Sequence, residues 1–203
     1  MYHHDPETLV HSTIAATNIA EGEEITITCE YSYPHIIPPT LLTYFTDIDL
    51  LEPREKRLEL LQVWGFSCTC PQCKLSNHAN LASEARVAKI GRYQNMLADW
   101  SSSSGGTPEM AEELMKLYEK EKLWSAIGTG HMYAALAWNA AASVADGYGK
   151  EGGVGEKEKR AVWHARRSVE IGTLASGAVE NNRKEMSQLA EKPREHWSWG
   201  LRA

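Results

Sequence analysis

Three of the four cysteines in this chain lie within six residues, in the run CTCPQC from Cys68 to Cys73. The N-terminus lacks the charged and apolar regions of a signal peptide, so we expect the protein to reside in a reducing compartment, the nucleus or the cytoplasm. In such a compartment, cysteines spaced as C-x-C-x2-C favour a metal ion over disulfides. Their thiolates can converge on one tetrahedral Zn²⁺ at distances of about 2.3 Å. We therefore predict a zinc site formed by Cys68, Cys70 and Cys73.

A closed structural zinc site needs a fourth ligand, and the sequence leaves its identity open. The local candidate is His78, five residues after the last cysteine of the cluster, which would complete a Cys3His site. The distant candidates are Cys29, His3 and His4. Since the chain has eight histidines, each one is more readily explained as a surface or core residue than as a ligand. The alternative for the whole cluster is three unrelated buried thiols.

The composition narrows the classes of protein to which the chain can belong. Its 203 residues suffice for one medium domain or two small ones. A formal net charge of -6 argues against direct binding of DNA or RNA, which requires a basic surface. No window approaches the roughly 20 consecutive apolar residues that cross a bilayer. We expect no direct nucleic-acid partner and no membrane partner, and the composition leaves the oligomeric state open.

The first part of the chain carries strand signals and one helix. Two β-prone runs between Val10 and Thr28 are joined by a turn at Gly22, which predicts a β-ribbon. The segment from Pro34 to Pro39 predicts a loop, because proline lacks the amide donor that a strand needs. Apolar residues at helical spacing then predict a helix from Pro53 to Gly65. We place a domain boundary near Leu75, which divides the chain into 1–75 and 76–203.

The second part of the chain predicts helices throughout. Thr107 and Pro108 are typical of a helix N-terminus, and the run SSSSGGT before them predicts a linker. The helices pair in a way similar to tetratricopeptide repeats, of which the length allows one or two. The fold class predicted for the whole chain is therefore α+β: a small β-rich part with a zinc knuckle, followed by an α-helical region. The predicted helices span approximately 81–100, 108–124, 131–145, 156–179 and 182–191.

Several motifs occur in an order that resembles one known family. The run GEEITIT from Gly22 resembles the strand near the end of SET domains, and REKRLELL from Arg54 resembles the helix that follows it. The run WGFSCTCPQC from Trp64 resembles the family's turn and post-SET cysteine knuckle. The tail LAEKPREHWSWGLR from Leu189 resembles the helical end of fungal members. Together these motifs resemble the C-terminal half of a SET-domain protein of the SET-and-MYND type, a family of lysine methyltransferases.

The resemblance implies a cofactor and a substrate. Members of the family transfer a methyl group from S-adenosylmethionine to the amine of a lysine in a protein or peptide. An aromatic residue at the position of Phe66 packs beside the adenine of the cofactor, and the zinc knuckle holds this segment over the site. Phe66 is therefore the candidate cofactor-binding residue, and the resemblance assigns no catalytic residue. The alternative is that Trp64 and Phe66 anchor the end of the helix in the core.

The chain also departs from the family pattern. The family's glycine motif and its Asn-His-x-Cys-x-Pro-Asn segment, which supplies a zinc cysteine, would lie upstream of Met1. Cys29 stands where the family has a tyrosine at the methyl-transfer site, and a thiol is a weak hydrogen-bond partner. We interpret residues 29–47 as an inserted loop or translated non-coding sequence, since they resemble neither flank. We therefore expect this chain alone to lack methyltransferase activity.

Two functions of other classes remain. The first is a non-catalytic interaction module, in which a zinc knuckle and paired helices bind a protein or peptide. The second is an unrelated zinc ribbon, whose folding around Cys68 to His78 depends on metal and which does not respond to S-adenosylmethionine.

Overall fold

The computed structural model describes residues 2–4, 11–13, 18–21, 51–62, 65, 67–68, 70–101, 105–143, 155–176 and 181–202. The chain divides into two compact units, which are described separately. The first unit joins Met1–Ile19 to Arg92–Ala203, and the second unit is Ala20–Gly91. The division into 1–75 and 76–203 stays a prediction.

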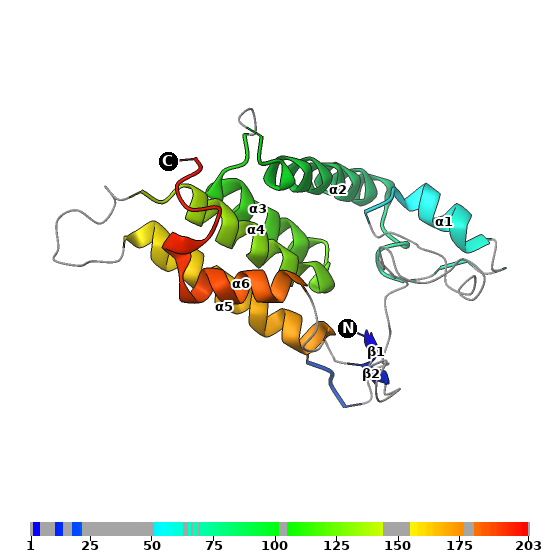
Figure 1. Ribbon diagram of the computed structural model, residues 1–203. Helices are drawn as coiled ribbons and strands as arrows, with labels where there is room; N and C mark the ends of the chain where they lie inside the picture. The colour runs from blue at the N-terminus through cyan, green and yellow to red at the C-terminus, as the bar shows by residue number, and fades with distance from the viewer. Residues whose placement is uncertain are drawn as a thin grey trace, which may run out of the picture. The chain divides into compact units, whose positions relative to one another are not determined.

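The described residues form six α-helices (Figure 1). Two short 3-10 helices, η1 (Trp124–Ala126) and η3 (Pro193–Glu195), and two strands of three residues, β1 (Tyr2–His4) and β2 (His11–Thr13), accompany them. None of the described helices is both long enough and apolar enough to cross a membrane. The α-helices are α1 (Arg54–Gln62), α2 (Asn77–Ala98), α3 (Pro108–Lys120), α4 (Ile127–Ala140), α5 (Glu156–Ser176) and α6 (Asn181–Glu191).

The α+β fold class predicted from the sequence is wrong, because the described part of the chain is an all-α protein. β2 lies in the first of the two runs that predicted a ribbon, but it pairs antiparallel with β1, with Tyr2 opposite Thr13. The second run, after Gly22, lies outside the described residues. A pair of three-residue strands is too short to form a layer of a core. The buried apolar side chains of the described residues lie on or beside the helices instead.

The core of the first unit forms where α3, α4, α5 and α6 pack together (Figure 1). α3 begins at Pro108, as the sequence predicted, and ends at Lys120. The hydroxyl of Thr107 accepts a hydrogen bond from the Met110 backbone N–H at 3.3 Å, a cap that contributes about 1 kcal/mol. One face of α3 is buried, and its buried residues are Ala111, Leu114, Leu117 and Tyr118.

α4 is the central helix of this unit, and small residues let its neighbours approach closely. A Cβ atom added at Gly130 would lie 2.8 Å from Cγ of Met115 and 3.2 Å from the Tyr118 ring, so α3 and α4 meet there with no room for a side chain. The alanines of α4 are buried along the rest of its length, as Ala134, Ala135, Ala137 and Ala140. The Ala-rich run therefore encodes a closely packed helix interface.

The C-terminal segment returns to the end of α4. The buried amide of Asn139 donates from Nδ2 to the Pro193 carbonyl at 3.1 Å and to the Ser198 hydroxyl at 2.8 Å. The backbone N–H of Gly200 donates to the Asn139 carbonyl at 3.2 Å, and that of Arg202 donates to the Ala140 carbonyl at 2.8 Å. These bonds satisfy carbonyl groups that the last turn of α4 would leave without partners. The tail is therefore part of the folded unit.

The second unit contains α1 and most of α2. α1 begins after Pro53, and the chain leaves it at Gly65, where a φ of 73° is in the left-handed region that glycine adopts readily. The Gly65 N–H donates to the Gln62 carbonyl at 2.9 Å, which closes the last turn. The helix predicted from Pro53 to Gly65 is thus found as Arg54–Gln62, with the chain turning at Gly65 before the cysteine cluster.

Candidate metal centre

The three cysteines lie on a tight turn between α1 and α2. Pro71 follows Cys70 and presets the backbone angle φ that a turn requires at this position. The Lys74 N–H donates to the Cys70 carbonyl at 3.0 Å, which closes the turn. Inside it, the Cys73 N–H donates to Sγ of Cys70 at 3.4 Å. The backbone thus directs a donor at a sulfur atom, which favours the thiolate form of that sulfur.

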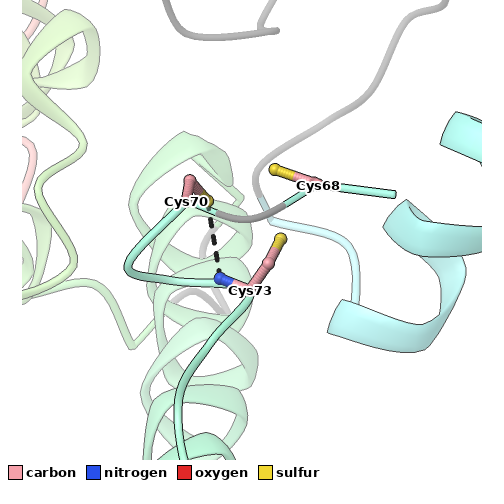
Figure 2. A group of neighbouring side chains, drawn as sticks. All are labelled: Cys68, Cys70 and Cys73. Atoms are coloured by element: carbon pink, nitrogen blue, oxygen red, sulfur yellow. Dashed lines mark hydrogen bonds between the residues drawn. The ribbon is translucent and has the colours of Figure 1, made fainter. Parts of the chain in front are cut away.

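The sulfur atoms of Cys68, Cys70 and Cys73 face one another (Figure 2). All three Sγ atoms lie within 4.8 Å of one another. Three sulfurs bound to one tetrahedral Zn²⁺ at about 2.3 Å would be separated by roughly 3.8 Å, so small side-chain rotations are sufficient. Cys70 is exposed and the other two cysteines are partly buried, which leaves a path for an ion to enter. This cluster could hold a metal ion such as zinc.

Two hydrogen bonds from side chains tie the turn to the helices on either side. Gln72 Nε2 donates to the buried Ser83 hydroxyl on α2 at 2.7 Å. Arg54, the first residue of α1, donates from its guanidinium to the Leu75 carbonyl at 2.8 Å. The spacing of the cysteines alone did not predict these contacts, because both join residues that are distant in sequence. They hold the ligand turn in place, as outer-shell partners do in metal sites.

The electrostatics of the three thiols also suit a cation. Burial acts to raise the pKa of Cys70, but the hydrogen bonds from the Cys73 N–H and from the thiols of Cys68 and Cys73 outweigh it and lower the pKa. Burial raises the pKa of Cys73 to about 12, and its hydrogen bonds to Cys68 and Cys70 and the negative charge on those sulfurs add to the rise. Ionising all three thiols together therefore needs a positive charge, which a bound metal ion would supply.

The candidate fourth ligands are not all brought to the cluster. His78 lies exposed near the start of α2 and is not part of the group formed by the three sulfurs. Cys29 lies outside the described residues, and so do the side chains of His3 and His4. Phe66, the candidate cofactor-binding residue, also lies outside the described residues. Its assignment stays a prediction.

Comparison of the chain with models of protein families, with curated proteins and with solved structures finds no match.

Proposed function

We propose that Cys68, Cys70 and Cys73 bind one Zn²⁺ as a structural site. The observation that carries this proposal is the convergence of the three sulfur atoms to within 4.8 Å. The hydrogen bond from the Cys73 N–H to Sγ of Cys70 supports it, since it stabilises a negatively charged sulfur. The anchoring of the turn to α1 and α2 supports a structural role, because metal binding there would hold the ends of two helices together.

We further propose that the chain belongs to the lineage of SET-and-MYND-type protein-lysine methyltransferases. Support comes from the order of its motifs: a GEEIT run, the REKR helix, the WGF turn and then C-x-C-x2-C. The structure is compatible with this order, since α1 ends at Gln62, the chain turns at Gly65 and the cysteine turn follows. In this lineage the methyl donor is S-adenosylmethionine and the acceptor is a lysine amine of a protein. The zinc site would then position the segment that carries Phe66.

The metal content of the purified chain tests the first proposal. We expect about one zinc per chain by elemental analysis after purification without chelators, and less than a tenth of that for Cys70→Ser or Cys73→Ser, because a two-thiolate site binds zinc far more weakly. His78→Ala is the matched control and should retain the metal, since this side chain is exposed outside the cluster. A parallel Cys29→Ser variant shows whether Cys29 is the fourth ligand. Wild-type protein without bound zinc would contradict the proposal.

Thermal denaturation with S-adenosylmethionine tests the lineage proposal. A ligand at 100 times its dissociation constant stabilises the folded protein by about 2.7 kcal/mol, which raises the melting temperature by a few degrees. We expect such a shift for the zinc-loaded chain and a smaller one for Phe66→Ala, because the resemblance places Phe66 beside the adenine. Adenosine triphosphate is the control for general nucleotide binding. The absence of a shift at millimolar S-adenosylmethionine would count against the proposal.

A second candidate function is a non-catalytic zinc-containing interaction module. The observation that favours it is the exposure of large apolar side chains on the first unit, where Trp163 on α5 is 55% exposed and Trp197 is 49% exposed. Exposed aromatic side chains are enriched at protein interfaces. This candidate predicts bound zinc together with no response to S-adenosylmethionine, so the two measurements above distinguish it from the methyltransferase lineage.

A further inference from the structure

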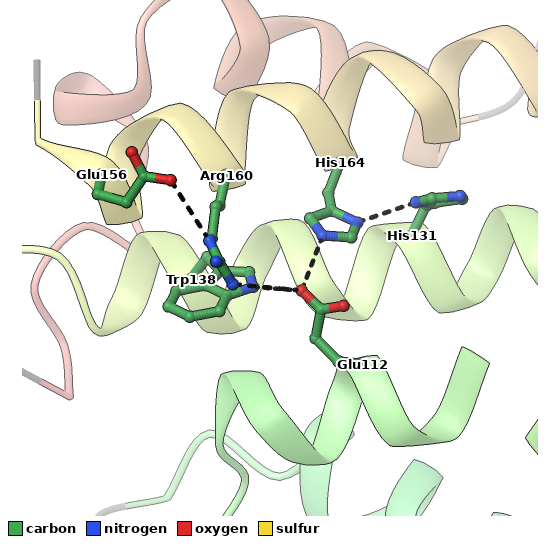
Figure 3. A network of polar contacts seen from close by, with 6 residues as sticks. All are labelled: Glu112, His131, Trp138, Glu156, Arg160 and His164. Carbon is green, nitrogen blue, oxygen red and sulfur yellow. Dashed lines mark hydrogen bonds and ion pairs between the residues drawn. The ribbon is translucent and has the colours of Figure 1, made fainter. Parts of the chain in front are cut away.

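Three helices of the first unit contribute to a polar chain that joins a half-buried glutamate to two buried histidines (Figure 3). Nδ1 of His131 on α4 lies 2.9 Å from Nδ1 of His164 on α5. Nε2 of His164 lies 3.3 Å from Oε1 of Glu112 on α3. Both histidines are buried, with 8% of His131 and 3% of His164 exposed. A direct contact between two imidazole nitrogens requires a proton on one nitrogen and a lone pair on the other.

The order of the three groups determines where the protons lie. The Glu112 carboxylate accepts only, so His164 donates its Nε2–H to it and, when neutral, carries a lone pair on Nδ1. His131 must then donate its Nδ1–H to that lone pair. A proton added to Nδ1 of His164 can be accepted once, because a neutral His131 can carry its own proton on Nε2 and accept at Nδ1. A further proton on His131 puts an N–H on both Nδ1 atoms, so the contact at 2.9 Å would become a repulsion. The arrangement therefore holds only while at least one of the two rings is neutral.

The surroundings of the pair make additional positive charge unfavourable. The Trp163 ring lies edge-on against both imidazoles, with centroids 5.4 Å from His131 and 4.6 Å from His164. Arg167 on α5 opposes a charge on His131, and Arg160 opposes a charge on His164. The Glu112 carboxylate favours a positive charge on the histidines. It also accepts a hydrogen bond from Trp138 Nε1 at 3.2 Å and lies 3.9 Å from the guanidinium of Arg160, so its negative charge is shared with these groups.

Two charged side chains from α6 and the segment after it, Glu185 and Arg194, are engaged with other partners. Glu185 on α6 accepts from Trp197 Nε1 at 2.7 Å and lies 3.7 Å from His196 Nε2. Arg194 pairs with Glu158 at 2.9 Å. The charges that act on the histidine pair thus come from Glu112 on α3 and from Arg160 and Arg167 on α5.

We propose that the Glu112–His164–His131 chain is an acid-sensitive latch that holds α4 against α5. While both rings are neutral the chain of hydrogen bonds is complete and the two helices stay packed. Protonation of both rings breaks the contact between the Nδ1 atoms. It favours a state in which α4 and α5 separate locally and the rings reach water. The packing of these helices thus becomes a function of pH, independently of the metal site and of the proposed enzymatic lineage.

The direction of the pH effect follows from the protonation equilibria. Burial lowers the pKa of His131 to about 4, with the charges of His164 and Arg167 adding to the effect, and burial also lowers the pKa of His164. The ordinary value, 6.5, applies in the opened state. The closed latch is therefore fully stable above pH 6.5, and its stability is lost as the pH falls from 6.5 toward 4. For each histidine that stays neutral in the closed state, the equilibrium constant for opening rises by up to about tenfold for every unit by which the pH falls within this window.

Amide hydrogen exchange of the full chain tests the latch. For the wild type we expect the protection factors of the amides in 131–140, corrected for intrinsic exchange, to fall by at least about 20-fold between pH 7.5 and pH 5. His131→Asn keeps an N–H donor toward His164 but does not titrate. The decrease in the protection factors between pH 7.5 and pH 5 should therefore be smaller than in the wild type by a factor of about ten or more. His78→Asn is the matched control, since His78 is exposed on α2, and it should behave as the wild type.

Two results would overturn the proposal: wild-type protection that does not change across this range, or an equal fall in His131→Asn. His196 is also buried with a lowered pKa, but it is present in every variant and its contribution cancels in the comparison. If His131→Asn does not fold, His164→Gln serves in its place, because its amide can donate to Glu112 and still does not titrate. The same fall in His164→Gln as in the wild type would equally contradict the latch.

Discussion

Removal of zinc is expected to unfold residues 54–91 while the helices of the first unit stay folded. The described residues of the second unit bury few apolar side chains, Leu61 and Ile90. A unit of this size without a substantial core usually depends on a metal or a disulfide for stability. Binding of a structural zinc ion contributes about 10–16 kcal/mol in small zinc-dependent domains, more than such a core can supply.

Hydrogen exchange after chelation measures this effect. We expect the amides of α1 and of residues 77–91 in α2 to lose protection in the chelated protein and in Cys70→Ser, and to regain it when zinc is returned to the wild type alone. Ser67→Ala is the control: Ser67 is exposed beside Cys68 but has no thiol. If chelated protein kept the protection of these amides, the metal would have no structural role, even if it were bound.

Replacing Asn139 by aspartate is expected to destabilise the first unit by about 3 kcal/mol or more at neutral pH. The change conserves the shape of the side chain but replaces the donor Nδ2 by an oxygen. That oxygen would face the Pro193 carbonyl, now 3.1 Å from Nδ2, and would bring a negative charge to a position that is 0% exposed. A hydrogen bond from the Ser198 hydroxyl to the aspartate would replace only one of the two hydrogen bonds that Asn139 makes. The contact with the Pro193 carbonyl would stay without a donor, so the loss of stability is not offset.

Urea denaturation at several pH values measures this loss of stability. Burial raises the pKa of a carboxyl group, so the aspartate variant should recover part of its stability as the pH falls and the group becomes neutral. Asn95→Asp, on the exposed face of α2, is the control and should change the free energy of unfolding by less than about 0.5 kcal/mol. Equal effects of the two substitutions would mean that the tail does not depend on Asn139.

Local features were the ones that the sequence predicted well. The start of α3 follows from Thr107 and Pro108, since a cap involves residues three positions apart. The clustering of the cysteines follows from their spacing, because a turn from Cys70 to Lys74 leaves their sulfurs within reach of one another. The fold class was predicted wrongly because strand propensity does not specify a partner or a length: β2 has three residues and pairs with the three residues of β1 before it.

The amino-acid sequence by itself determined the clustering of the three cysteines and the approximate positions of the helices, because both depend on contacts within one or two turns of the chain. Tertiary structure alone decided the interactions between distant residues: His131 meets His164 across 33 positions, and Asn139 meets Ser198 across 59. Such pairs depend on which helix faces pack together, and this is set by burial of the entire apolar surface rather than by any local pattern. For that reason the histidine latch and the docking of the tail became visible only in the folded chain.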